Sequence, residues 1–153
     1  MVLSTLHTND APSTISRLMN MGIEPFLVAT SVNLICAQRL VRRICVQCKE
    51  PLQIQAPALI EAGYSPDEAA KTTVQHGKGC ATCNNTGYKG RVGLYEVMEI
   101  NDELRELILV GASALEIKKK ALEQGMITLR RSGLQKVAAG QTTMEEVLRE
   151  TVL

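Results

Sequence analysis

Two Cys-x-x-Cys pairs constrain this chain more than any other feature of its sequence. Cys45 and Cys48 form the first pair, Cys80 and Cys83 form the second pair, and 31 residues lie between the two pairs. A turn of backbone lets each pair present two thiolates to one ion, and four thiolates suit tetrahedral Zn²⁺. Four protein ligands leave no open coordination position. The spacing therefore predicts a structural rather than a catalytic zinc site within residues 45–91.

The cysteines also allow other interpretations. A redox-active pair needs only one Cys-x-x-Cys, placed at the start of a helix, whereas Cys45 is expected to follow the end of a helix. A disulfide framework and unliganded thiols are further alternatives, although paired cysteines in a cytosolic chain more often bind metal. His76 is a candidate replacement ligand near Cys80, and a plain loop histidine is its simpler interpretation. The fifth cysteine, Cys36, is predicted to lie in the core on the apolar face of a helix.

Composition and charge limit the classes of protein to which the chain can belong. With 45% hydrophobic and 22% charged residues, it is typical of a globular protein. The 17 basic and 16 acidic side chains leave a net charge of only +1, and Phe26, Tyr64, Tyr88 and Tyr95 are the aromatic residues. A nucleic-acid-binding surface usually carries a basic excess and, for single strands, more stacking side chains. We therefore expect no nucleic-acid partner.

The sequence shows no pattern typical of a membrane anchor or a secretion signal. Its longest apolar runs are much shorter than the roughly 20 residues of a membrane-spanning helix. No signal-peptide pattern precedes Leu3. We expect a soluble, cytosolic chain without a transmembrane segment.

The first 44 residues are predicted to form a strand and two helices. Residues 2–6 are apolar and indicate a short strand, which a polar turn at residues 7–10 follows. Asp10 can cap the free amides of a helix that runs to about Asn20. A second, longer helix is expected over residues 24–44, buried on more than one side because apolar side chains cover much of its surface.

Capping residues predict the helices of the remaining chain. Ser65 and Glu68 form a capping box for one short helix between the cysteine pairs. Residues 84–91 are expected to form a turn, and residues 92–100 a strand. Four short helices are then predicted to form a small bundle, and they begin near Asn101, Ser113, Thr128 and Thr143.

The sequence contains no phosphate-binding loop of the G-x-x-x-x-G-K-[ST] type. The segment Gly77-Lys78-Gly79 lacks both the upstream glycine and the following hydroxyl residue. No apolar strand ends in acidic residues that could hold Mg²⁺. The residues of this chain alone therefore do not predict binding and hydrolysis of a nucleoside triphosphate.

Several motifs together resemble one family. The stretch "VLSTLHTNDAPSTISRLMNMGIEPFLVATSVNLICAQRLVRRIC" resembles the His-box region of the type II/type IV secretion ATPases. The similarity continues through the cysteine pairs, "TGYKGRVGLYEVMEI" and the terminal helices, so it covers essentially the whole chain. Within the family, the chain is most similar to the ATPase that extends type IV pili, and the ATPase of type II secretion follows closely.

The resemblance implies the fold class and the division of the chain. We expect an α-rich α/β fold: the C-terminal part of a RecA-like P-loop ATPase domain, with a tetracysteine zinc subdomain and a C-terminal helical bundle. Residues 1–44 would belong to the ATPase core, residues 45–91 to the zinc-binding subdomain, and residues 92–153 to a strand and the helical subdomain. The family's phosphate loop precedes the His box, so the chain is expected to be a C-terminal fragment that is inactive alone.

The resemblance also implies an activity and partners. The full-length protein would be a homo-hexamer that hydrolyses ATP with Mg²⁺ at the cytoplasmic face of the bacterial inner membrane. It would drive pilin assembly through an integral-membrane platform protein. Residue by residue, His7 matches the His-box histidine near the γ-phosphate, and Arg91 resembles an arginine close to nucleotide.

Simpler interpretations of these residues remain open. His7 could be a structural turn residue and Arg91 a solvated side chain beside a strand. Arg39, Arg42 and Arg43 either face a neighbouring subunit or form a solvated helix end. Besides a pilus or type II secretion ATPase fragment, the chain could be a stand-alone zinc-binding interaction module or a nucleic-acid-binding zinc ribbon.

Overall fold

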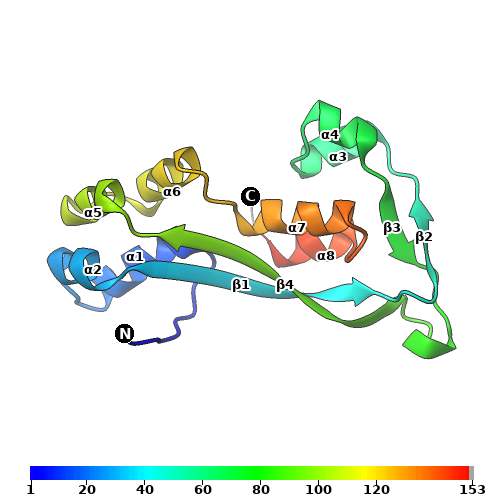
Figure 1. Cartoon of the computed structure of the whole chain (residues 1–153), viewed down its shortest axis with the longest axis horizontal. Helices are drawn as coiled ribbons and strands as arrows, with labels where there is room; N and C mark the ends of the chain where they lie inside the picture. The colour runs from blue at the N-terminus through cyan, green and yellow to red at the C-terminus, as the bar shows by residue number, and fades with distance from the viewer. Residues whose placement is uncertain (152–153) are drawn as a thin grey trace. The chain divides into compact units, whose positions relative to one another are not determined.

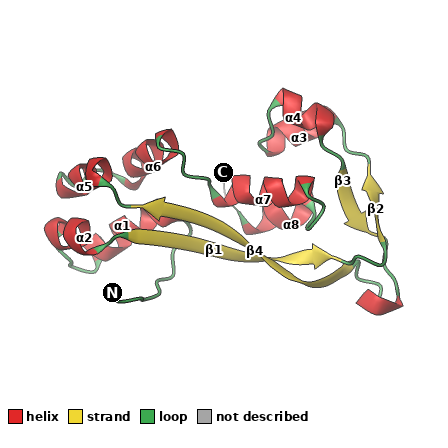
Figure 2. Cartoon of the chain, in the orientation of Figure 1, coloured by secondary structure: helices red, strands yellow, loops and turns green. Residues whose placement is uncertain are grey.

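The computed structural model describes residues 1–151 and has a mixed α/β fold (Figure 1; Figure 2). Within these residues, the helices are α1 (Ala11–Asn20), α2 (Pro25–Ser31), α3 (Ala56–Ala62), α4 (Pro66–Lys71), α5 (Asp102–Leu109), α6 (Ala114–Glu123), α7 (Leu129–Ala138) and α8 (Met144–Glu150), with a short 3₁₀ helix η1 (Ala81–Cys83). The strands are β1 (Leu34–Ile44), β2 (Lys49–Leu52), β3 (Val74–Gly77) and β4 (Tyr88–Glu99). They form two two-stranded sheets, β1–β4 and β2–β3.

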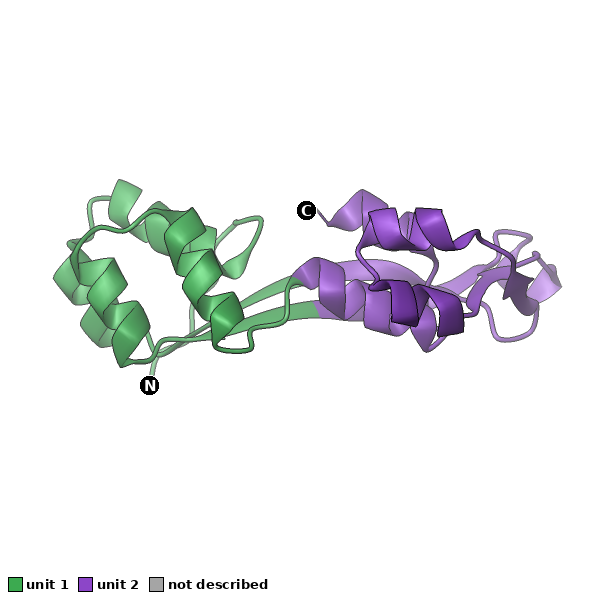
Figure 3. Cartoon of the chain, turned by 90° about the horizontal axis from the view of Figure 1, so that it is seen from above, with its two compact units in different colours: residues 1–38, 95–128 green, residues 39–94, 129–153 purple. Residues whose placement is uncertain are grey.

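The chain divides into two compact units (Figure 3). Unit 1 contains residues 1–38 and 95–128, and unit 2 contains residues 39–94 and 129–153. Strands β1 and β4 contribute residues to both units. The division into parts at residues 44/45 and 91/92 stays a prediction about the organisation of the full-length protein.

Unit 1 is built from helices α1, α2, α5 and α6 together with parts of β1 and β4. Helix α2 packs on α5, and α6 packs on both α1 and α5. Its fully buried side chains include Ile15, Leu104, Ile108 and Ile117. These positions form the apolar faces of amphipathic helices, so burial of the faces holds the unit together.

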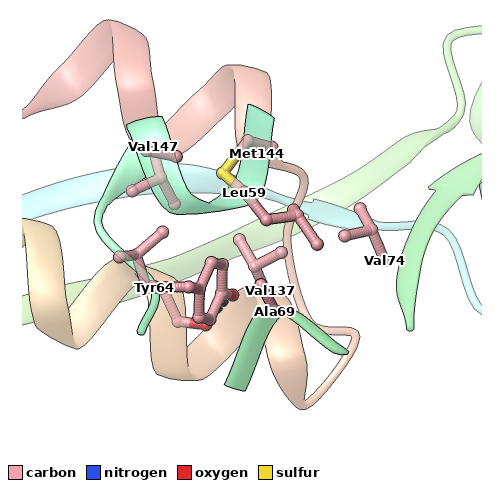
Figure 4. Packing of buried hydrophobic residues seen from close by; sticks show 9 residues of the cluster. Leu59, Tyr64, Ala69, Val74, Val137, Met144 and Val147 are labelled. Atoms are coloured by element: carbon pink, nitrogen blue, oxygen red, sulfur yellow. Dashed lines mark hydrogen bonds between the residues drawn. The ribbon is translucent and has the colours of Figure 1, made fainter. Parts of the chain in front are cut away.

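Unit 2 contains the β2–β3 hairpin, an antiparallel strand pair whose connection holds helices α3 and α4. Helices α7 and α8 complete the unit. The hairpin is antiparallel, with Lys49 opposite Gly77 and Leu52 opposite Val74. One hydrophobic cluster joins the hairpin to the helices (Figure 4), and its buried members are Leu59, Ala62, Tyr64, Ala69, Val74, Leu134, Val137, Met144 and Val147. The Tyr64 hydroxyl donates a 2.6 Å hydrogen bond to the Leu134 carbonyl, and burial raises the pKa of Tyr64 to about 12.

The predicted helix over residues 24–44 is wrong in its second part. Helix α2 ends at Ser31, and β1 follows from Leu34 to Ile44. Ile35 and Ala37 are buried while the residues between and beside them are exposed, which is the period-2 pattern of a strand. Because β1 turns Cys36 outward, the prediction that this cysteine lies in the core is also wrong.

The predicted strand over residues 2–6 is not formed in this structure. These residues have no regular secondary structure and are exposed. A strand needs a neighbour to pair its backbone amides and carbonyls, so an apolar sequence alone does not produce one. The segment is the irregular lead into α1.

Most helix starts that depend on a local cap are confirmed. Asp10 caps α1, Ser65 caps α4, and Ser113 caps α6, each in a capping box with the residue three positions later. Asn101 and Thr143 cap α5 and α8. The single C-terminal bundle is corrected, because α5 and α6 belong to unit 1 whereas α7 and α8 belong to unit 2.

The strand that follows the second cysteine pair is longer than predicted. Strand β4 begins at Tyr88, so the expected turn over residues 84–91 is confined to its first half. Helix α3, between the cysteine pairs, was not predicted from the sequence. Its Gly63 C-cap has φ of +117°, a left-handed conformation that glycine adopts without the strain other residues would incur.

Candidate metal centre

The four cysteines lie at the ends of three elements, β1, β2 and the 3₁₀ helix η1. Cys45 directly follows β1, and Cys48 directly precedes β2. Cys80 precedes the 3₁₀ helix η1, and Cys83 is the last residue of that helix. The antiparallel pairing of β2 with β3 brings the chain back beside Cys48, where the Lys78 amide donates a 2.9 Å hydrogen bond to the Cys48 carbonyl.

The four sulfur atoms form one cluster. All four Sγ atoms lie within 4.8 Å of one another. Cys45 is 3.9 Å from Cys80, Cys48 is 3.8 Å from Cys83, and Cys80 is 3.7 Å from Cys83, as measured between their Sγ atoms. A tetrahedron with metal–sulfur bonds of about 2.3 Å has edges of about 3.8 Å. The sulfur separations therefore fit a four-thiolate tetrahedral metal site.

Backbone amides point at two of the sulfurs. The Gly79 amide donates to Cys48 Sγ at 3.3 Å, and the amides of Cys80 and Gly87 donate to Cys83 Sγ at 3.2 Å and 3.3 Å. Such donors stabilise a thiolate and orient it for a metal ion. The segments that carry the cysteines thus supply the metal ligands and also the backbone amides that hydrogen-bond to two of them.

The surroundings shift the pKa values of these thiols in opposite directions. Burial opposes ionisation of Cys83, but the amides of Cys80 and Gly87 together with the neighbouring thiols of Cys80 and Cys48 outweigh it and lower the pKa of the Cys83 thiol to about 6. The Cys83 amide lowers the pKa of the Cys80 thiol, whereas burial raises the pKa of Cys48 to about 12. Since a metal ion binds the thiolate form, binding at this site releases protons.

Two glycines permit the close approach of backbone beside the cluster. A Cβ atom on Gly77 would lie 2.0 Å from the Gly87 carbonyl oxygen, and a Cβ atom on Gly87 would lie 2.4 Å from the Gly77 carbonyl oxygen. Both contacts are with backbone, so rotation of a side chain cannot relieve them. The absence of a side chain at both positions is therefore a condition for the cysteines to converge.

We expect Gly77→Ala to weaken the metal site and to destabilise unit 2 by about 2 kcal/mol or more, because overpacking forces the backbone apart. Gly90→Ala is the matched control. Its Cβ would meet nothing within 4 Å, so only the left-handed backbone (φ +81°) adds a cost of about 1 kcal/mol. Metal content and urea unfolding measure both effects, and equal losses in the two variants would contradict the steric explanation.

His76 does not join the cluster. It lies on β3, where its Nε2 is 3.3 Å from a carboxylate oxygen of Glu50 on β2. The group of metal-capable side chains found in the described part of the chain consists of the four cysteines. The four cysteines are therefore a better set of metal ligands than one in which His76 replaces a cysteine.

The two residues assigned to nucleotide by resemblance lie in separate units. His7 is exposed in the loop before α1, in unit 1, and Arg91 is exposed on β4, in unit 2. Their roles stay predictions.

The chain matches known proteins along nearly its whole length. The family model described as "Type II/IV secretion system protein" matches residues 1–149. The chain belongs to this family. A type IV pilus assembly ATPase PilB of Myxococcus xanthus is 56% identical over 99% of the chain, and one of Thermus thermophilus is 44% identical over 99%. A type II secretion system protein E of Dickeya dadantii is 48% identical over 99% of the chain.

The similarity covers only part of each relative. The chain spans 27% of the Myxococcus protein, 17% of the Thermus protein and 29% of the Dickeya protein. Across residues 1–151, no helix has both the length and the apolar character needed to span a bilayer.

Arg42 has a structural partner that the sequence did not reveal. Its backbone amide donates to Glu146 Oε2 at 2.8 Å, and its Nε and Nη2 donate to Glu146 Oε1 at 2.9 Å and 2.7 Å. The guanidinium also lies 4.1 Å from the centroid of the Tyr88 ring. These contacts fix β1 and β4 against α8 within unit 2, so Arg42 is not a solvated helix end.

Proposed function

We propose that the full-length protein containing this chain is an ATPase that drives type IV pilus assembly. The observation that carries the proposal is the 56% identity, over 99% of the chain, to a protein named type IV pilus assembly ATPase. Three further relatives with the same name, between 44% and 49% identical, support it. Hydrolysis of ATP with Mg²⁺ would supply the free energy for assembling pilin subunits.

The proposed assembly is a homo-hexamer with RecA-like cores at the cytoplasmic face of a bacterial inner membrane. Its partner would be the integral-membrane platform protein of the pilus machine. This chain would supply the His box, the metal centre and the terminal helices. The near-zero net charge favours a protein partner over nucleic acid.

The second candidate is an ATPase of type II secretion. It is favoured by the 48% identity to the type II secretion system protein E of Dickeya dadantii, which also covers 99% of the chain. The two candidates share the hydrolytic reaction and differ in the substrate that is moved. The presence or loss of surface pili therefore distinguishes them.

The proposed role of the metal centre is structural. Four thiolates around one Zn²⁺ complete a tetrahedron and leave no position for water or substrate. The sulfur separations and the amide donors support this donor set. The ion would link Cys45 and Cys48 to Cys80 and Cys83. It would thereby hold together the ends of β2 and β3, which lie between the two cysteine pairs.

ATP hydrolysis by the purified full-length protein tests the proposal. We expect Mg²⁺-dependent turnover by the full-length protein and none by residues 1–153 alone, because the phosphate-loop pattern is absent from this sequence. Failure of the full-length protein to hydrolyse ATP would favour a stand-alone zinc-binding module.

His7 would act in the hydrolytic step. In the full-length protein, His7→Ala is expected to lower kcat by about 10²-fold, the typical loss on removing one donor that stabilises transition-state charge. The KM for ATP should change little, because the interaction strengthens only in the transition state. Steady-state kinetics check this, with Arg17→Ala on α1 as a control for charge and surface changes nearby. Wild-type turnover by His7→Ala would instead make His7 a structural turn residue.

A further inference from the structure

A buried acidic residue in unit 1 contacts the segment that follows His7. Glu96 lies on β4 and is only 2% exposed. Its Oε1 accepts a 2.7 Å hydrogen bond from the backbone amide of Ala11, the first residue of α1, which is itself fully buried. These two residues are 85 positions apart in the chain. The side chain thus ties β4 to the start of the helix that the His-box loop enters.

This hydrogen bond gives a partner to both the Ala11 amide and the buried Glu96 carboxylate. Amides in the first turn of a helix have no partner within the helix, and the helix dipole makes this end favourable for negative charge. A carboxylate taken out of water is costly unless hydrogen bonds compensate it. Glu96 and the start of α1 therefore stabilise each other only while α1 begins at this position.

The loop on the other side of Ala11 is held as well. The Asp10 carboxylate accepts a 2.9 Å hydrogen bond from the Ser13 amide. The hydroxyls of Thr8 and Thr14 are 2.8 Å apart, and the Thr14 hydroxyl donates to the Asp10 carbonyl at 3.2 Å. Local hydrogen bonds thus hold the backbone from Thr8 to Thr14 in one conformation, and the bond from Ala11 to Glu96 attaches this segment to β4. His7 is exposed directly before it.

We propose that Glu96 is a positioning residue for His7: its carboxylate holds the start of α1 against β4 and thereby sets where the His7 imidazole reaches. This inference rests on the proposed function, in which His7 acts on the transferred phosphoryl group. Glu96 would act on the position of His7 through its hydrogen bond with the Ala11 amide.

The test uses the full-length protein and the variants Glu96→Ala and Glu96→Gln. Glu96→Ala is expected to lower kcat by about 10-fold to 100-fold, since a displacement of about 1 Å at a reacting group can cost about 10²-fold in rate. The KM for ATP should change less than about twofold. Glu96→Gln keeps an acceptor oxygen for the Ala11 amide, so its loss should be smaller. Glu99→Gln changes an exposed carboxylate on the same strand and should leave kcat unchanged.

A double-mutant cycle separates positioning from general stability. With His7→Ala already present, Glu96→Ala should lower kcat by less than about twofold further, because the group it positions is gone. A further loss as large as in the wild-type background would overturn the inference. Should Glu96→Ala fail to fold, Glu96→Gln carries the same cycle.

Amide exchange distinguishes this inference from the proposed function. In the full-length protein, exchange of the segment 8–14 should be at least about tenfold faster in Glu96→Ala than in Glu99→Gln, because the anchor of the loop is lost. If His7→Ala leaves turnover intact, the proposed role of His7 fails, and with it the positioning of a catalytic group. Unchanged exchange together with reduced kcat in His7→Ala would overturn the role of Glu96 alone.

Discussion

Removal of the metal is expected to unfold unit 2 around the β2–β3 hairpin. Structural Zn²⁺ in small domains contributes an apparent free energy of about 10–16 kcal/mol at neutral pH, which is comparable to the whole stability of a typical domain, about 5–15 kcal/mol. The loop from Cys45 to Cys83 closes through the cluster, and the two flanking strands are only four residues each. A strand pair of that length is marginal by itself, and besides the metal it is held by the packing of Val74 in the hydrophobic cluster.

The matched substitutions are Cys83→Ser and Cys36→Ser. Cys83 is buried in the cluster, whereas Cys36 is exposed on β1 and belongs to no metal-capable group within residues 1–151. Cys83→Ser should lose the metal and the protection of hairpin amides from exchange, and Cys36→Ser should keep both. Chelated protein that retains wild-type amide protection would show that the metal is not structural.

Glu146→Ala is expected to destabilise unit 2 by about 2 kcal/mol, because the hydrogen bonds that the buried carboxylate accepts from the Arg42 amide and guanidinium are lost, although the half-exposed guanidinium can be solvated instead. Glu146 is fully buried on α8, where it accepts the three hydrogen bonds from Arg42 and lies 2.8 Å from a guanidinium nitrogen of Arg149. Glu145→Ala is the control, since Glu145 is exposed on the same helix. Urea unfolding at pH 7 with saturating zinc measures both, and a loss in Glu146→Ala no larger than in the control would contradict this role.

The same carboxylate predicts a pH dependence. Burial alone would raise the pKa of Glu146, but the hydrogen bonds from Arg42 and the charges of Arg42 and Arg149 lower it below its usual range. A carboxyl with a lowered folded-state pKa contributes stability that is complete above its unfolded pKa of about 4.3 and is lost as the pH falls through the folded value. The stability difference between wild type and Glu146→Gln should therefore narrow below about pH 4. A difference that stays constant to pH 3 would mean that the charge does not matter.

Sequence reasoning succeeded where the cause of a structure is local. The caps at Ser65 and Ser113 act on amides three residues away, so their helices could be predicted from a few neighbouring letters. The Cys-x-x-Cys spacing likewise brings two sulfurs together within one turn. Joining the two pairs into one cluster required only the assumption that four thiolates share one ion.

It failed where the cause is distant. Strand β1 exists because β4 pairs with it, and the two are separated by more than forty residues of intervening chain. The partners of Glu96 and Glu146 lie 85 and 104 positions away, so no short motif marks either carboxylate. In the sequence, Glu146 follows Thr143 at the spacing of a capping box. The structure gives its carboxylate to Arg42 instead and leaves only the Glu146 amide bonded to the Thr143 hydroxyl.

The number of surface pili on intact cells tests whether the full-length protein drives pilus assembly. The cells would lack the gene for the full-length protein and would be complemented with the wild type, with His7→Ala, or with Cys83→Ser. We expect pili to return with the wild type and with neither variant, while secretion of exported proteins is unaffected throughout. Normal piliation in the uncomplemented cells, with loss of protein secretion, would contradict the proposed function and favour type II secretion.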